Sequence, residues 1–95
     1  MTPILKRVAA VAEAAGIQLY GGCLLESSVG AAAHLHAFAT FRELHWGCEH
    51  FGPQILTGEF VTEPLRFEDF QVHLPTGPGI GVTLDPAALR RYARQ

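Results

Sequence analysis

The sequence contains few charged residues, and this scarcity excludes several classes of protein. Charged side chains make up 17% of the 95 residues, hydrophobic ones make up 48%, and the formal net charge is −2. Proteins that bind nucleic acids gather lysine and arginine to neutralise phosphates, and no cluster of that size is present. No apolar run reaches the ~20 residues that span a bilayer. We therefore expect neither a nucleic acid nor a membrane as a partner.

Cysteine is also scarce, and the N-terminus carries no recognisable targeting signal. Cys23 and Cys48 are the only cysteines, and two cysteines alone do not make a disulfide framework. The opening MTPILKRVAA lacks the charged-then-apolar order of a secretion signal. These features predict a cytoplasmic location. The excess of core-forming residues over charge predicts a chain that other protein covers, and we expect a homo-oligomer.

The first forty residues have the pattern of a helix, a strand and a second helix. Residues 2–16 combine Pro3 in the first turn with a glycine, Gly16, after the last apolar position, as helices commonly do. One apolar stripe at helical spacing contains Ile4, Leu5, Val8, Val11, Ala12 and Ala15. The following IQLYGGC is apolar on both faces, like a strand of a parallel sheet. An alanine-rich helix from Ser27 or Ser28, either of which can cap it, to about Thr40 completes an α/β unit.

The remaining sequence changes character after Thr40. Residues 41–60 have no clean period and predict irregular structure with at most a short helical turn. Residues 65–74 alternate around Glu68 and Asp69, which predicts a hairpin. Glycine- and proline-rich coil follows, and then a short helix that Asp85 caps. One parallel strand cannot make a sheet, and a barrel needs eight strands in about 250 residues. The α/β unit fits a barrel or a doubly wound sheet, and we expect the chain to be the end of a larger structure of this kind.

Glu26 lies where the predicted strand gives way to the second helix. In α/β barrels the reacting groups lie at this carboxyl end of the strands. A carboxylate there can hold a proton, balance a cation or orient a substrate oxygen. It can also simply favour the positive end of the following helix dipole. The pattern leaves both roles open.

Other groups of reactive side chains have poorer spacing. HWGCEH places Cys48 among histidines, as a zinc site would need, but His34 and His36 point about 200° apart on a helix and cannot share one ion. Ser27, His34 and Asp69 could form a catalytic triad only by chance, since no G-x-S-x-G is present. The glycines of GPGIG do not open a helix, which argues against nucleotide binding. We expect this chain alone to form no metal site.

Four stretches together carry a family resemblance: GGCLLESSVGAAAHLHAF, WGCEHFGP, TEPLRFEDFQVHLPTGPGIGVTLD and RRYARQ. In this order they resemble the C-terminal part of muconate and chloromuconate cycloisomerases, in the enolase superfamily. The resemblance implies that residues 2–16 are the seventh barrel helix, 17–25 the eighth strand and 28–40 the eighth helix. It divides the chain into the last barrel elements, 1–59, and a hairpin, coil and short helix associated with the capping domain, 60–95.

The resemblance also implies a function for the parent enzyme. That family cycloisomerises cis,cis-muconate, a dicarboxylate of aromatic catabolism, reversibly to muconolactone with Mn²⁺ or Mg²⁺. Glu26 matches a glutamate that acts electrostatically around the enolate-like intermediate, and Cys23 and Leu24 match positions that line the substrate pocket. The acidic metal ligands and catalytic lysines of the family come from strands that are not in this sequence, and Lys6 is its only lysine. We therefore expect the isolated chain to be inactive and to depend on the remainder of a barrel and capping domain.

Two alternatives remain open at this point. The parent enzyme could be a sister of the same superfamily, such as o-succinylbenzoate synthase, N-acylamino acid racemase or dipeptide epimerase. The chain could instead be a non-catalytic association module, whose exposed sheet edges would need a partner.

Overall fold

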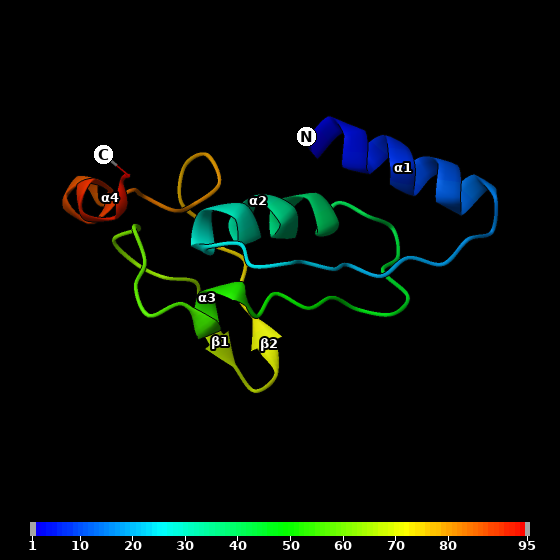
Figure 1. The fold of residues 1–95 in the computed structure, drawn as a ribbon. Helices are drawn as coiled ribbons and strands as arrows, with labels where there is room; N and C mark the ends of the chain where they lie inside the picture. Colours follow the sequence, from blue (N-terminus) through cyan, green and yellow to red (C-terminus); the bar gives the residue numbers. More distant parts are fainter. Residues whose placement is uncertain (1, 95) are drawn as a thin grey trace.

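The computed structural model describes residues 2–94, in which four helices and one short hairpin are formed. Helix α2 lies in the middle of an elongated molecule, with α1 towards one end and α4 at the other (Figure 1). None of the described helices combines the length and the apolar run needed to cross a bilayer. The elements are α1 (Thr2–Ala14), α2 (Ser28–Phe38), α3 (Gly52–Ile55), β1 (Phe67–Glu68), β2 (Gln71–Val72) and α4 (Pro86–Tyr92).

Helix α1 forms as the sequence predicts, but most of its apolar stripe is uncovered. Gly16 follows it with a φ of 68°, the left-handed conformation that lets the chain leave a helix. Ala12 is buried. Ile4, Val8 and Val11 are 61%, 57% and 69% exposed. The stripe therefore has the spacing of a helix that faces a core, but the described residues of this chain leave most of it uncovered.

The predicted strand over residues 17–25 is wrong as a regular element. The structure has only one isolated parallel bridge there, between Gly21 and Cys48. Gly21 donates its N–H to the Gly47 carbonyl oxygen at 3.0 Å and accepts from the Glu49 N–H at 2.9 Å. A barrel strand is paired on both sides, whereas this segment pairs on one side with residues 46–49. It is extended, but the described residues do not complete a sheet around it.

Helix α2 is the centre of the core. Its small side chains let the later part of the chain approach closely, and Ala31 and Ala32 are 1% and 0% exposed. Leu35 and Leu65 complete the buried cluster. Partly buried residues that pack against it are Phe67, Val72, Ile80 and Val82. Residues between 65 and 82 therefore cover α2 directly, instead of a sheet.

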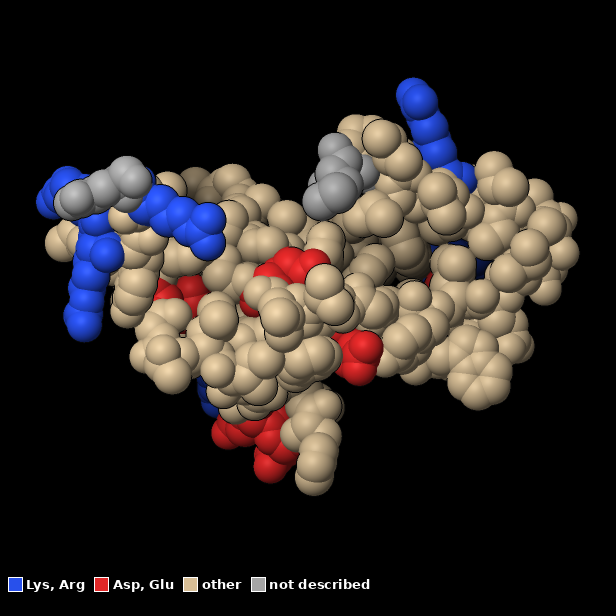
Figure 2. Space-filling model, in the orientation of Figure 1, with Lys and Arg blue, Asp and Glu red and all other residues tan. Residues whose placement is uncertain are grey.

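The two late elements were predicted correctly from local signals. β1 and β2 pair antiparallel, with Phe67 opposite Val72. The turn places Asp69 and Phe70 at φ values of 49° and 60°. The Asp85 carboxylate accepts from the Ala87 and Ala88 N–H groups at 2.9 and 3.2 Å and so caps α4. Basic side chains gather where α4 lies, and acidic ones over the hairpin (Figure 2).

The predicted serine cap of α2 is wrong, and a distant carboxylate replaces it. Ser27 occupies the cap position without a side-chain hydrogen bond. Glu59 Oε1 instead accepts from the Ser28 N–H at 2.8 Å and from the Ser28 hydroxyl at 2.7 Å. The same hydroxyl accepts from the Leu65 N–H at 3.2 Å. A negative charge at a helix N-terminus is favourable, so Glu59 stabilises α2 from a position 31 residues away in the sequence.

We expect Ser28→Ala to lower the free energy of unfolding by about 2 kcal/mol. Ser28 is fully buried, and loss of its hydroxyl leaves the Leu65 N–H without an acceptor and removes one of the two hydrogen bonds to Glu59 Oε1. Ser27→Ala is the matched control, because the Ser27 side chain makes no cap hydrogen bond, and it should cost less than about 0.5 kcal/mol. Urea unfolding followed by circular dichroism compares the two. Equal losses would contradict the structural role assigned to the Ser28 hydroxyl.

Candidate functional site

Glu26 lies on the loop between the extended segment and α2, together with the other two predicted site residues. Its Oε2 accepts from the Leu24 N–H at 2.8 Å, so the carboxylate turns back over its own loop. The Cys23 thiol lies 3.8 Å from the Leu24 carbonyl oxygen. Leu24 is 74% exposed and Cys23 is half-buried. The loop therefore places an acid, a thiol and an apolar side chain within four consecutive residues.

Two glycines pack closely against Glu26, one against its backbone and one against its side chain. A Cβ at Gly52 would lie 2.1 Å from the Glu26 carbonyl oxygen and 2.9 Å from its nitrogen. A Cβ at Gly30 would lie 2.9 Å from both Cβ and Cγ of Glu26. We call Gly30 and Gly52 the glycine clamp. Because one belongs to α2 and the other to α3, the position of Glu26 depends on how these helices pack.

The surroundings of Glu26 favour its ionised form. Hydrogen bonding from its own backbone N–H is the largest effect that lowers its pKa, and the Leu24 N–H and nearby His34 act in the same direction. Partial burial opposes them, but the net pKa is lowered. A carboxylate of low pKa is a weak proton acceptor near neutral pH. The site therefore suits Glu26 to stabilising positive charge or orienting a neighbour, and suits it poorly to accepting a proton.

A second acid, Glu49, lies at the same edge, although no sequence pattern predicts it there. It ends the segment 46–49 that runs parallel to residues 19–21, so both segments end on one side. Partial burial, and next a hydrogen bond with Glu49, raise the pKa of the Tyr20 hydroxyl. Nothing in the irregular pattern of residues 41–60 indicates the pairing that brings Glu49 here. Only the prediction that residues 46–49 pair in parallel with the GGC segment would have placed Glu49 at this edge.

Two histidines lie next to this edge without hydrogen bonds. The rings of His34 and His50 are 6.0 Å apart, and the Phe38 ring lies 5.6 Å from that of His50. His50 is 4% exposed. Both of its ring nitrogens and the His34 Nδ1 are buried without partners. His36 instead donates Nε2–H to the Ile80 carbonyl oxygen at 3.0 Å, which confirms that His34 and His36 point apart.

The metal-binding side chains of the sequence do not gather. Over residues 2–94, no group of three or more His, Cys, Asp or Glu side chains is placed to hold an ion. Cys23 and Cys48 are both free thiols, and burial raises the pKa of Cys48. The residues present therefore do not fit the divalent metal site that the resemblance implies for the parent enzyme.

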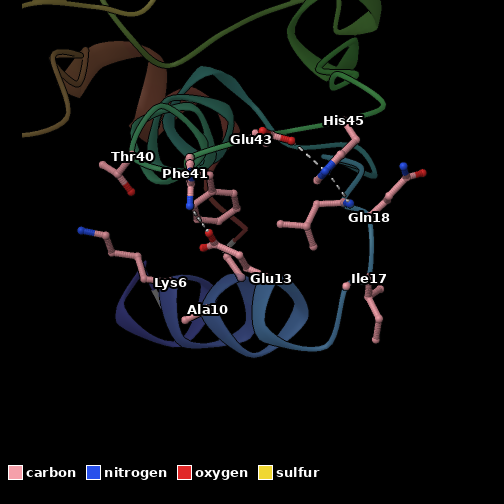
Figure 3. Close-up of a pocket in the computed structure, with 13 residues that line it drawn as sticks. Lys6, Ala10, Glu13, Ile17, Gln18, Thr40, Phe41, Glu43 and His45 are labelled. Atoms are coloured by element: carbon pink, nitrogen blue, oxygen red, sulfur yellow. Dashed lines mark hydrogen bonds and ion pairs between the residues drawn. The ribbon is translucent and has the colours of Figure 1, made fainter.

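One of the two main hollows is formed between α1 and residues 40–45, and Glu26 does not line it. It encloses about 520 Å³ and is bounded by Lys6 and Ala10 on one side and by Thr40 and Phe41 on the other (Figure 3). Arg42 pairs with Glu13 at 3.0 Å across it. None of the residues 21–26 lines this hollow. Lys6, the single lysine, therefore lines a hollow to which the predicted site residues do not contribute.

Comparison with known proteins decides the family. Residues 4–88 match the model of the enolase C-terminal domain-like family. The chain belongs to the enolase C-terminal domain-like family. Its curated relatives include muconate cycloisomerase 1 of Pseudomonas putida, 56% identical over 89 residues, which are 94% of this chain and 24% of the relative. A chloromuconate cycloisomerase of Delftia acidovorans is 51% identical over 93% of this chain and 24% of its own length.

Solved structures of this enolase-like family give the same result. The muconate lactonizing enzyme of Pseudomonas putida superposes with a TM-score of 0.89 at 57% identity, over 93% of this chain and 24% of the enzyme. That of Klebsiella pneumoniae superposes with a TM-score of 0.88 at 54% identity, over 92% of this chain and 24% of the enzyme. The predicted resemblance and α/β barrel fold class are confirmed. The chain spans about a quarter of the length of the relatives it matches.

Proposed function

We propose that this chain forms the closing part of a muconate-type cycloisomerase. The whole enzyme would convert cis,cis-muconate or a chloromuconate, both dicarboxylates, reversibly to the corresponding muconolactone in the cytoplasm. The observation that carries the proposal is 56% identity to a muconate cycloisomerase over 94% of the chain. Residues 1–59 would supply the last barrel elements. Residues 60–95 would continue towards the capping domain and its neighbours in a homo-oligomer.

Glu26 is the residue of this chain that we assign to the reaction. Its lowered pKa keeps it charged, and the glycine clamp fixes its backbone at the end of the extended segment. A fixed negative charge at that edge stabilises cationic partners, such as a lysine supplied by another barrel strand, without itself moving a proton. Cys23 and Leu24 would line the pocket beside it, Leu24 by its exposed apolar side chain.

The rest of the barrel would bind the metal ion that the reaction needs. Enzymes of this family generally depend on a divalent metal, and for this one we propose Mn²⁺ or Mg²⁺. Since residues 2–94 offer no group of three metal-binding side chains, the ligands would belong to other strands. The chain's own part in the chemistry is to place Glu26 and to close the pocket against water.

A chimeric enzyme tests the proposal. The matching 24% of Pseudomonas putida muconate cycloisomerase 1 is replaced by this chain, and the loss of cis,cis-muconate is followed by ultraviolet absorbance with Mn²⁺. We expect turnover within about tenfold of the unaltered enzyme. A second assay with chlorinated muconates ranks the two substrates. A folded chimera that turns over neither would contradict the proposal.

In the same chimera, Glu26→Gln separates a functional charge from a structural one. We expect kcat to fall by about 10²-fold, as when a fixed electrostatic group is lost from an active site, with little change in melting temperature. Glu49→Gln is the matched control, because Glu49 lies at the same edge and also carries one carboxylate. If Glu26→Gln leaves kcat unchanged, Glu26 serves only the dipole of α2. If Glu49→Gln has the larger effect, the assignment belongs to Glu49.

A further inference from the structure

His50 is a buried polar side chain whose hydrogen-bonding groups are not satisfied. It is 4% exposed, and neither ring nitrogen has a hydrogen-bond partner. A neutral imidazole carries one donor and one acceptor, and leaving them unmet in the interior is unfavourable. Its neighbours on α2 are the rings of Phe38, at 5.6 Å, and His34, at 6.0 Å. His34 also has a buried nitrogen without a partner.

The charged groups around this histidine pair, His34 and His50, decide how it responds to acid. Glu26 approaches from the loop before α2, and Glu49 from the same segment as His50; both favour a proton on His50. Glu68 and Asp69 of the hairpin line the same hollow as His50. Burial, which is the largest effect, and the nearby His34 both disfavour a proton on His50. Together they outweigh the two carboxylates, so the pKa of His50 lies below its ordinary 6.5.

The histidine pair is connected to Glu26 through the glycine clamp. His50 precedes Gly52 by two residues, and Gly52 packs on the backbone of Glu26. His34 lies one helical turn after Gly30, which packs on the side chain of Glu26. The pair therefore joins the same two segments that hold the acid. Separating the two rings would separate Gly52 from Gly30.

We propose that the histidine pair is an acid-sensitive device that positions Glu26: while both rings are neutral they pack and close the glycine clamp, and protonation of His50 opens it. Adding a charge to a buried ring without hydrogen-bond partners disfavours the packed state. The segment from 46 to 52 then leaves α2, and Glu26 loses the contact that fixes its backbone. The positioning of Glu26 for catalysis rests on the proposed function, whereas the acid response of the fold does not.

The sign of the effect follows from the proton balance. Because the pKa of His50 is lower in the folded chain than in the unfolded chain, the unfolded chain binds more protons as the pH falls. The stabilisation is complete above pH 6.5, the ordinary value, and is lost as the pH falls from there towards the lowered value. The unfolding equilibrium constant rises by up to about tenfold per pH unit in this window. The pKa of Glu26 is also lowered, from an ordinary value of 4.5, so protonation of Glu26 reduces the stability only at still lower pH.

The test is urea unfolding of the 95-residue chain between pH 5 and 8, compared among three proteins. We expect the unaltered chain to lose stability below about pH 6.5, with a slope of up to about tenfold per unit. His50→Leu replaces the imidazole by an apolar side chain of similar size and should abolish the slope. His73→Leu removes an exposed imidazole of the tail and should keep it. A slope that survives in His50→Leu would overturn the proposal.

Nuclear magnetic resonance of the unaltered chain gives a second reading that does not depend on a variant folding. We expect the His50 ring signal to titrate with a midpoint below 6.5, and the amide signals of Glu26, Gly30 and Gly52 to shift with the same midpoint. A His50 midpoint at or above 6.5 overturns the device. Amides that stay constant through the His50 titration overturn its coupling to Glu26. An inactive chimera with these signals intact contradicts only the proposed function.

Discussion

Gly52→Ala is expected to destabilise the fold by about 4 kcal/mol, among the largest effects a single methyl group can have. The new Cβ would lie 2.1 Å from the carbonyl oxygen of Glu26, 2.9 Å from its nitrogen and 3.1 Å from its carbonyl carbon. All three are backbone atoms, so no rotation of a side chain relieves the overlap. Either α3 or the loop before α2 has to move, and cores that are packed at close to crystal density resist such movement.

Gly22→Ala is the matched control for this experiment. Its added Cβ meets only the Tyr20 ring, at 3.9 Å, which is ordinary contact, and we expect a change below about 0.5 kcal/mol. Urea unfolding of both variants gives the difference. In the chimera, Gly52→Ala should also lower muconate turnover, because it displaces Glu26. A Gly52→Ala protein as stable as Gly22→Ala would mean that the glycine clamp is not a close contact in solution.

The sequence predicts the elements whose signals are local. Gly16 ends α1 because glycine adopts a positive φ there without strain. Asp85 caps α4 because its carboxylate reaches N–H groups only two and three residues ahead. The hairpin follows from alternation over ten residues. In each case the residues that determine the structure are neighbours in the chain, so a pattern is enough.

The strand over 17–25 was not formed because a strand depends on residues elsewhere. A helix satisfies its own backbone, whereas a strand needs a partner on each side. Among the described residues, only 46–49 pair with it. The relatives are about four times as long, and the apolar pattern of IQLYGGC fits a segment that is enclosed on both faces. The apolar pattern therefore fits the enclosed environment of a barrel strand, although no regular strand forms in this chain.

The resemblance implies site residues only where they are contiguous. Cys23, Leu24 and Glu26 are close neighbours in the sequence and share one loop, and their roles in a site stay predictions. The cap by Glu59 spans 31 residues, and the approach of Glu49 and His50 to Glu26 depends on how residues 41–52 fold over α2. No periodicity marks that segment. The residues that now set the charge and position of Glu26 could therefore not be found from the sequence.

The isolated chain is expected to show no muconate turnover and to associate with itself. Turnover should be absent with Mn²⁺ present, because residues 2–94 bring no three metal-binding side chains together and Lys6 lines a hollow to which Glu26 does not contribute. Association should follow from the stripe on α1, where Ile4, Val8 and Val11 are more than half exposed. The surface over α1 is largely uncharged (Figure 2). Exposed apolar patches of this kind are normally covered by protein.

Sedimentation over a range of concentrations, with two variants, identifies the surface responsible. The double variant Val8→Glu, Val11→Glu places charge on the stripe and should shift the chain to a monomer. Phe70→Ser is the matched control, because Phe70 is also fully exposed but lies at the tip of the hairpin, far along the chain from α1. It should leave the association unchanged. Two results would contradict the assignment of the association surface to α1. One is an unaltered chain that is monomeric, and the other is a Phe70→Ser variant that becomes monomeric while the double variant does not.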